Sequence, residues 1–329
     1  MTTPSSAEVG FSESTGALIK DLLDKFLVGV DATELLSTTH TVVEHLPPLY
    51  RGIGESFIHN MTSVVSTVTL PFMLVASSVH LQHRTRLHLA ERIRAQGLER
   101  EVNETNEAFE RRREEHALQV AKARMKEFEK SVEGRELMVR DTCKFLLRQS
   151  EDQEVADAAL GMLLQGIVLL WGGFEVLARD LFVAHLNQQP KEAEILLKDP
   201  TTRKRFQLPK DPIELLAERG FNLANSMGSL LGERQDLSDL TTIKMIYLRL
   251  FPTNDALREA LNNPKMWLIN QQRHLVVHRR GVIDQDYLNS TGAKVGLGDR
   301  LTVAPSDLED HLSIICEAGT TLLQAIPTR

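Results

Sequence analysis

The sequence predicts an all-α protein whose only β-structure is one small hairpin near the C-terminus. Aromatic residues are scarce at 5%, and Ala, Leu, Glu, Arg and Gln recur, a composition that favours helices. Apolar residues also return every three or four positions over long stretches, as in amphipathic helices. The expected order is an N-terminal helical region (1–82), a long charged helix or helical strut (83–150) and a C-terminal helical bundle (151–329).

The N-terminal region combines short amphipathic helices with one long apolar stretch. Residues 1–14 are polar and are expected to form an unstructured tail, and Asp31 has the residue type of a helix N-cap. Residues 61–81 have the length of a membrane span, but they contain Pro71 and many Ser and Thr residues. We expect a buried helix pair broken at Pro71; insertion into a membrane, or association with one, is the alternative.

The middle of the chain is dense in charge. Residues 82–149 contain no proline, which predicts a long solvated helix or an antiparallel helix pair. Leu89, Ile93 and Leu98 keep roughly helical spacing without a sustained heptad repeat, so the coiled-coil signal is weak. We expect a strut that also supplies a surface for self-association; binding of a partner helix or of a membrane is the alternative.

The next helices are marked by their apolar content and by their ends. Residues 155–187 are apolar on most sides and predict a buried helix. Asp211 and Pro212 have the pattern of an N-cap followed by a first-turn proline. The stretch 237–251 predicts a further helix that ends before Pro252.

The last part of the chain predicts two helices with the hairpin between them. Asn263 and Pro264 mark the start of a helix that stops at Gly281. The β-favouring segments "VIDQDYL" (282–288) and "DRLTV" (299–303) are separated by glycines, which predicts the hairpin. Ser306 and Glu309 have the spacing of a capping box at the start of the final helix.

Charge and cysteine content narrow the function classes. The net charge of −7 gives no general attraction to nucleic acid, so binding would need a local basic surface. Two cysteines, Cys143 and Cys316, can form neither a disulfide framework nor a thiolate zinc site. The first residues lack the pattern of a secretory signal, and together these features predict a reducing, cytoplasmic location and no cofactor.

The spacing R-x4–6-H occurs three times, in very different surroundings. The pairs are Arg111 with His116, Arg179 with His185, and Arg273 with His278. The first lies in the charged strut, and in the second Arg179 is expected to pair with Glu175 one turn earlier. The third lies in "NQQRHLVVHRRGVID" (270–284), on a helix apolar on nearly every side. Such a helix should be covered all round, so Arg273 would need an anion or a hydrogen-bonded partner.

Arginine and histidine in this segment suit cleavage of a phosphodiester bond. Histidine as a residue type titrates near neutrality and can move a proton, which makes His278 the candidate acid or base, and the guanidinium of Arg273 can hold a phosphate. The two side chains lie about 140° apart around a helix, so two copies of the helix facing each other would unite them more easily than one. His274 shares a face with His278. The expected basic surface for RNA comprises Arg279 and Arg280, with Arg203, Lys204 and Arg205.

Two segments resemble the HEPN superfamily. "RHLVVHRRGVID" and the glycine-containing stretch after it resemble the last core helix and hairpin of that family, and "WGGFEVLARDLF" (171–182) resembles its first core helix. The resemblance covers about residues 155–325. It implies a helical bundle that dimerises and a metal-independent endoribonuclease of bacterial toxin–antitoxin or antiviral defence systems. Arg273 and His278 match the family motif, His274 stands at its polar position, where Asn is more usual, and Glu175 supports the site.

Three hypotheses follow. We expect RNA cleavage at a cleft between two copies of the chain, which leaves a 2′,3′-cyclic phosphate and a 5′-hydroxyl; the expected partners are RNA, a second copy and an antitoxin or defence-system protein, but no membrane. The second hypothesis is a zinc site on His274 and His278, although no acidic ligand follows the pattern H-E-x-x-H. The third is a non-catalytic RNA-binding or dimerisation module that acts as a scaffold or sensor, in which Arg273 and His278 form a packing pair.

Overall fold

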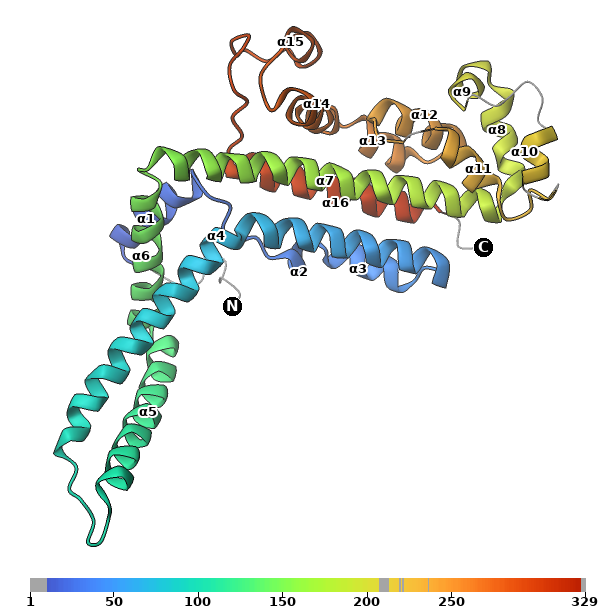
Figure 1. Ribbon diagram of the computed structural model, residues 1–329. Coiled ribbons are helices and arrows are strands. Elements are labelled where there is room, and N and C mark those ends of the chain that lie inside the picture. The colour runs from blue at the N-terminus through green and yellow to red at the C-terminus, as the bar shows by residue number, and fades with distance from the viewer. Residues whose placement is uncertain (1–10, 207–212, 219, 221, 236, 327–329) are drawn as a thin grey trace. The chain divides into compact units, whose positions relative to one another are not determined.

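The computed structural model describes residues 11–206, 213–218, 220, 222–235 and 237–326, and these residues form helices and loops with no β-strand (Figure 1). The all-α prediction is therefore confirmed for this part of the chain. The chain divides into two compact units, 1–29 with 69–159, and 30–68 with 160–329. The boundaries expected near residues 82 and 150 both fall inside the first unit.

The first unit is built from α1, α5, α6 and the adjoining parts of two long helices. Its helices are α1 (Glu13–Leu23), the second part of α4 (Pro48–Arg94), the short η1 (Ala95–Gly97), α5 (Asn106–Lys130), α6 (Val132–Gln149) and the start of α7 (Gln153–Gln188). Leu22 and Phe26, at and just beyond the end of α1, pack with Cys143 and Leu146 of α6, and Phe72 of α4 adjoins this core. The amphipathic pattern of the first helix is thus used as expected.

Charged pairs tie α4 to α5 and α6 beyond this small core. His83 lies 3.0 Å from Asp141, and Arg92 lies 2.9 Å from Glu114. The buried Glu91 carboxylate accepts from Arg124 at 2.7 Å. The strut was expected to be either one long helix or an antiparallel pair, and the structure has the antiparallel pair. Charged side chains of α4 face opposite charges on α5 and α6, which stabilises this arrangement.

The second unit contains the remaining helices. They are α2 (Ala32–Leu35), α3 (Ser37–Glu44), the first part of α4, most of α7, η2 (Pro190–Glu192), α8 (Ala193–Lys198), α9 (Pro200–Arg205), α10 (Ile213–Glu218), α11 (Met227–Arg234), α12 (Leu240–Leu250), α13 (Asp255–Asn262), α14 (Pro264–Arg279), α15 (Gln285–Thr291) and α16 (Pro305–Ala325).

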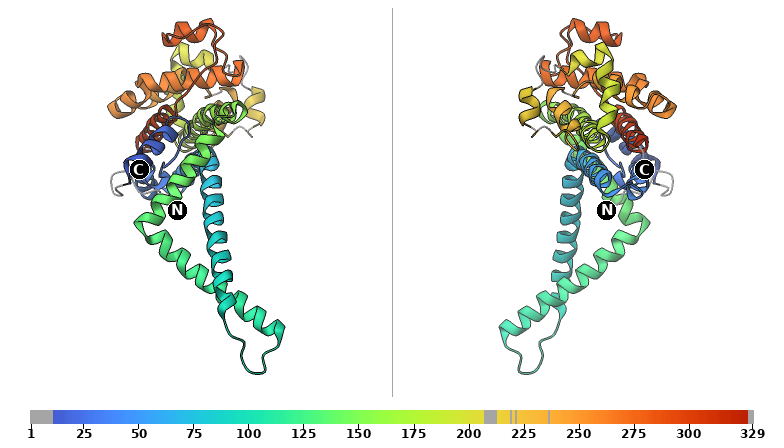
Figure 2. Two further views of the ribbon diagram at one scale, coloured as in Figure 1. Left: turned by 90° about the vertical axis from the view of Figure 1, so that its left-hand side faces the viewer. Right: turned by 90° about the vertical axis from the view of Figure 1, so that its right-hand side faces the viewer.

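Helices α7 and α16 form the middle layer of this unit. Helix α3 and the first part of α4 lie on one side of them and α12 to α14 on the other (Figures 1 and 2). Glycines allow the layers to approach closely: a β-carbon at Gly166 of α7 would lie 3.0 Å from Val68 of α4 and 2.8 Å from Leu308 of α16. Trp171 and Phe174 of α7 are fully buried in this core. The predicted burial of 155–187 is confirmed for this central part of α7.

The expected break at Pro71 is wrong. Helix α4 runs without interruption from Pro48 to Arg94 with Pro71 inside it. Proline removes one backbone hydrogen bond and crowds the preceding turn, which a 47-residue helix tolerates. The stretch is also not buried as expected: in the most apolar window of the segment Pro48–Gly97, only 28% of residues are buried. This segment and α7 both have the length and composition of membrane-crossing helices, a test that core helices of soluble proteins also pass.

The expected β-hairpin is also wrong. Residues 285–291 form α15, whose N-cap Asp284 accepts a hydrogen bond from the backbone N–H of Tyr287 at 2.8 Å. In the described part of the chain only one isolated antiparallel bridge, Val282 with Arg300, is formed. The β-favouring composition was overridden by this cap and by burial of Ile283 and Tyr287 on one side.

Helix starts were predicted with mixed success. Asp31 caps α2 and Asn263 caps α14, with Pro264 in its first turn, as expected. The last helix begins at Pro305, where Asp307 accepts from the backbone N–H of Ala304, so the predicted Ser306–Glu309 capping box is wrong. Asp211 and Pro212 lie outside the described residues.

Candidate functional site

Helix α14 carries the three residues predicted for catalysis. Its first turn is fixed by Asn263, whose side chain accepts from the backbone N–H of Lys265 at 2.9 Å. Its last turn ends at Arg280, which has a left-handed φ of 56°, followed by Gly281 at 78°. The predicted stop at Gly281 is thus displaced by one residue, and the end of the helix presents Arg279 and Arg280 to solvent.

One side of α14 is buried and the other is open in the single chain. Met266, Ile269 and Leu275 are buried against the unit, whereas His274 and His278 are exposed. The expectation that the helix is covered all round is therefore wrong. Gln271, His274 and His278 follow each other at intervals of three and four, so they form a polar line on one face of this largely apolar helix.

Arg273 lies about 100° from His274 around the helix, off this polar line, and is held by Glu175 of α7. Its Nη2 is 3.4 Å from Oε2 of Glu175, with 22% and 25% of the two side chains exposed. The Nε atom of Arg273 is buried and has no hydrogen-bond partner. Of the two kinds of partner expected for Arg273, an anion or a hydrogen-bonded group, the structure provides an anion, the carboxylate of Glu175.

His274 and His278 contact each other. Their ring centroids are 4.5 Å apart and the ring planes are inclined at 48°. Both rings are exposed, so a polynucleotide or a second protein chain can reach them. These are the residues of the site that could exchange protons with a bound ligand.

The basic residues expected to bind RNA form two separate groups. Arg279 Nε lies 3.2 Å from Asp284, and 62% of the arginine side chain remains exposed. Arg203, Lys204 and Arg205 are exposed on α9, which lies beyond α12, away from α14 and α15 (Figure 1). One patch therefore adjoins the histidines, while the other lies apart from them.

The other two R-x4–6-H pairs have different surroundings. Arg111 and His116 are exposed on α5. Arg179 Nε is 3.2 Å from Asp180, the neighbouring residue, rather than in the pair expected with Glu175. His185 is buried, with Nε2 2.7 Å from Glu192. Its ring centroid lies 5.2 Å from that of Phe251, so the imidazole is part of the core.

Two polar features escaped the sequence reasoning. Gln272, between Gln271 and Arg273, is buried, and its Oε1 lies 2.8 Å from Nε2 of His311 on α16. Trp267 and Lys244 line a pocket beside the same helix. The sequence signal for the second feature was present, because Trp267 lies seven residues before His274 and therefore on the same face.

Metal ligands and thiol groups are the other candidates for catalytic chemistry. Within the described ranges no group of three or more His, Cys, Asp or Glu side chains is placed to hold a metal ion. Cys143 and Cys316 are free and buried, and burial raises their thiol pKa to about 11 and about 12. Neither thiol is therefore activated as a nucleophile.

Comparison of the chain with protein-family models, with curated proteins and with solved structures found no match.

Proposed function

We propose that this protein is a metal-independent endoribonuclease that cleaves RNA at a cleft formed by two copies of α14. The observation that carries the proposal is the pair of exposed, touching imidazoles on a helix whose Arg273 is held by a carboxylate. The resemblance of "RHLVVHRRGVID" to the HEPN superfamily supports the same chemistry. A cytoplasmic toxin or antiviral defence effector, restrained by a protein partner, is the biological role that this resemblance suggests.

The proposed reaction is an attack by the RNA on itself. One imidazole removes the proton of a ribose 2′-hydroxyl, and the 2′-oxygen attacks the adjacent phosphorus atom. The bond to the 5′-oxygen breaks, and that oxygen takes a proton from a second, protonated imidazole. His278 is assigned as acid or base and His274 as the assisting group. Arg273 stabilises the negative charge on the phosphate oxygens.

Two copies of the chain provide what one α14 lacks. Arg273 points about 140° away from His278 around the helix, so one phosphate reaches both groups more easily when they come from facing helices. The polar line of α14 is uncovered in the single chain and is free to face its own copy. The exposed Arg279 and Arg280 then follow the RNA backbone on either side.

The test is cleavage of total RNA by the full-length protein and by His278→Ala. We expect the substitution to slow cleavage by at least about 100-fold, because a positioned acid or base contributes about that much or more. Products should end in a 2′,3′-cyclic phosphate and a 5′-hydroxyl, and a chelator should not change the rate. Products with a 5′-phosphate, or cleavage that stops with the chelator, would contradict the mechanism.

A second function has one observation in its favour. The ion pair of Arg273 with Glu175 balances the charge of the arginine inside the chain, as a packing role requires. In this alternative the protein binds RNA or dimerises without cutting. Binding of RNA by both the parent protein and His278→Ala, with cleavage by neither, would decide for this alternative.

A further inference from the structure

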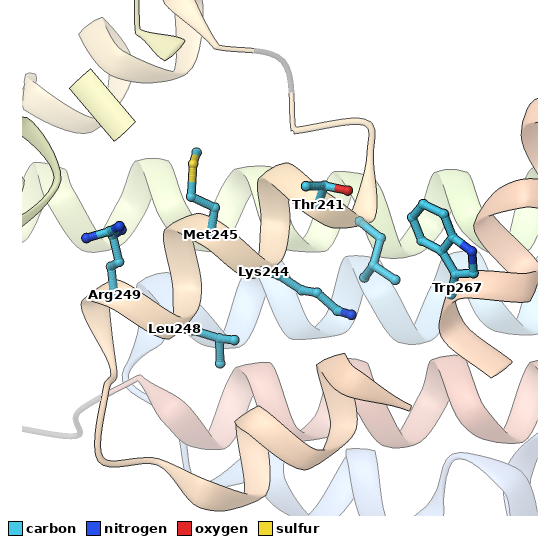
Figure 3. A pocket seen from close by; sticks show the side chains of 7 residues that line it. Thr241, Lys244, Met245, Leu248, Arg249 and Trp267 are labelled. Carbon is cyan, nitrogen blue, oxygen red and sulfur yellow. The ribbon is translucent and has the colours of Figure 1, made fainter. Parts of the chain in front are cut away.

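A pocket of about 490 Å³ lies on the surface of the second unit beside the start of α14 (Figure 3). Helix α12 contributes most of its lining, and Trp267 of α14 closes one end. The lining residues are Leu240, Thr241, Lys244, Met245, Leu248, Arg249 and Trp267. This volume lies in the range of small-molecule and cofactor sites.

The two ends of the pocket differ in chemistry. The indole N–H of Trp267 donates to the carbonyl of Ser290 at 3.1 Å, which anchors the ring at the pocket edge. At the other end Arg249 is 3.1 Å from Asp199. Figure 3 shows Lys244 extending between these ends toward Trp267. An aromatic ring and a cation therefore share one apolar hollow.

Lys244 differs from its cationic neighbour Arg249, which has an acidic partner in Asp199. Among the residues that the structure describes, its ammonium forms no ion pair and no hydrogen bond. Partial burial lowers its pKa, as expected for a cation in an apolar setting without a counter-ion. An anionic group in the pocket would supply that counter-ion.

The pocket is aligned with the histidines of α14. Trp267, Gln271, His274 and His278 follow each other at intervals of four, three and four, so they lie on one face of the helix. At about 1.5 Å per residue, Trp267 and His278 are about 16 Å apart along the axis. A single strand lying along this face would reach both.

We propose that this pocket binds one unpaired nucleotide of a single-stranded RNA, with the base stacked on Trp267 and a phosphate on Lys244. The inference rests on the proposed function in taking RNA as the ligand, and it adds the requirement for an unpaired base on one side of the cut. Aromatic stacking accepts any base, so the pocket sets strandedness rather than sequence. A free nucleotide has the same chemistry and is the other source of such a ligand.

The experiment measures binding of fluorescein-labelled oligouridine by anisotropy over a range of KCl concentrations, in full-length His278→Ala so that the RNA survives. Adding Lys244→Ala should weaken binding several-fold and lower the slope of log affinity against log salt by about one, as loss of one phosphate contact requires. Lys191→Ala removes an equal charge from an exposed position and should change neither quantity. Trp267→Ala should weaken binding by roughly 5- to 100-fold and Trp267→Phe by less.

The outcomes separate the two proposals. Unchanged affinity and salt slope in Lys244→Ala, with helical content intact by circular dichroism, would overturn the pocket and leave the nuclease untouched. Loss of binding in Lys244→Ala, with no cleavage by the parent protein, would keep the pocket and overturn the nuclease. Competition by uridine monophosphate at the concentrations at which oligouridine binds would assign the pocket to a free nucleotide and overturn its role in RNA.

Discussion

His311 is a buried histidine that is hydrogen-bonded to Gln272, the neighbour of Arg273 on α14. It lies on α16 and is 4% exposed; Nε2 contacts Gln272, and Nδ1 has no partner. Burial lowers its pKa below the ordinary value of 6.5, although Asp307 and Asp310 act in the opposite direction and Lys265 in the same one. The neutral form is therefore the one that fits the folded protein.

The lowered pKa of His311 predicts how the free energy of unfolding depends on pH. Because its pKa is lower in the folded than in the unfolded state, His311 costs no stability above about pH 6.5 and increasingly destabilises the fold as the pH falls below it. His311→Gln should remove this contribution, which for one proton is at most about 1.4 kcal/mol per pH unit. Urea unfolding between pH 7 and 5, followed by tryptophan fluorescence, measures the difference.

The control is His116→Gln, which changes an exposed histidine on α5. It should reproduce the pH dependence of the parent protein. If His311→Gln does so as well, the folded protein accommodates a charged His311, and the assigned burial penalty is wrong.

Residues of the site were predictable to the extent that burial decides their behaviour. An arginine among apolar residues needs an anion or a hydrogen-bonded partner, and Arg273 has Glu175 at 3.4 Å. The exposure of His274 and His278 was not predicted, because a helical wheel shows which residues share a face but not whether another element covers it. The pocket that Lys244 and Trp267 share was not predicted either, because α12 and α14 are separate in sequence and only the fold brings them together.

Among the elements, local signals predicted caps better than breaks. Asp31 and Asn263 accept backbone hydrogen bonds within two or three residues, so their role is contained in the sequence around them. Pro71 and the segment 282–288 depend on what packs nearby. A proline inside a long helix and a β-favouring run with a capping Asp284 both follow the tertiary context instead of propensity.

Close packing of α11 against α7 gives a prediction about two glycines. A β-carbon at Gly228 of α11 would lie 2.1 Å from the backbone oxygen of Val183, whereas one at Gly172 of α7 would meet nothing within 4 Å. Gly228→Ala should therefore lower the free energy of unfolding by about 1–3 kcal/mol, since backbone must move. Gly172→Ala should raise it by about 0.5–1 kcal/mol through helix propensity.

Urea unfolding of the two variants against the parent protein checks this pair. The same chemical change is made twice in helices of one unit. Gly228 lies in the first turn of α11, where helix propensity contributes little, so a loss of stability there would reflect the contact with Val183. Equal effects of the same sign would show that α11 does not approach α7 as closely as the structure places it.

At the scale of the whole molecule, the candidate site lies entirely in the second unit, with Glu175 from α7 and the histidines from α14. The first unit contributes no residue to it. The sequence predicts a strut that serves self-association, and in the structure this strut is an antiparallel helix pair whose charged side chains face opposite charges. What the strut contacts depends on surfaces of other molecules, about which propensity and periodicity carry no information.

The proposed two-copy cleft makes the surface of α14 decisive for activity. Val277 lies between His274 and His278 in sequence and is 45% exposed. A twofold interface uses the same surface of both copies, so Val277→Glu buries one new carboxylate from each copy in the proposed contact. We expect this variant to be monomeric by sedimentation equilibrium and to lose at least about 100-fold in RNA cleavage, because His278 and the Arg273 of the other copy no longer meet.

Ile195→Glu is the matched control, since Ile195 of α8 is also 45% exposed and β-branched. It should leave both the oligomeric state and cleavage unchanged. Because the carboxylate introduced by Val277→Glu would also adjoin His278, dilution of the parent protein supplies an independent measurement: cleavage per chain should fall in proportion to the dimer fraction. A monomer that cleaves at the full rate would show that one α14 is sufficient, and the cleft would have to be built within a single chain.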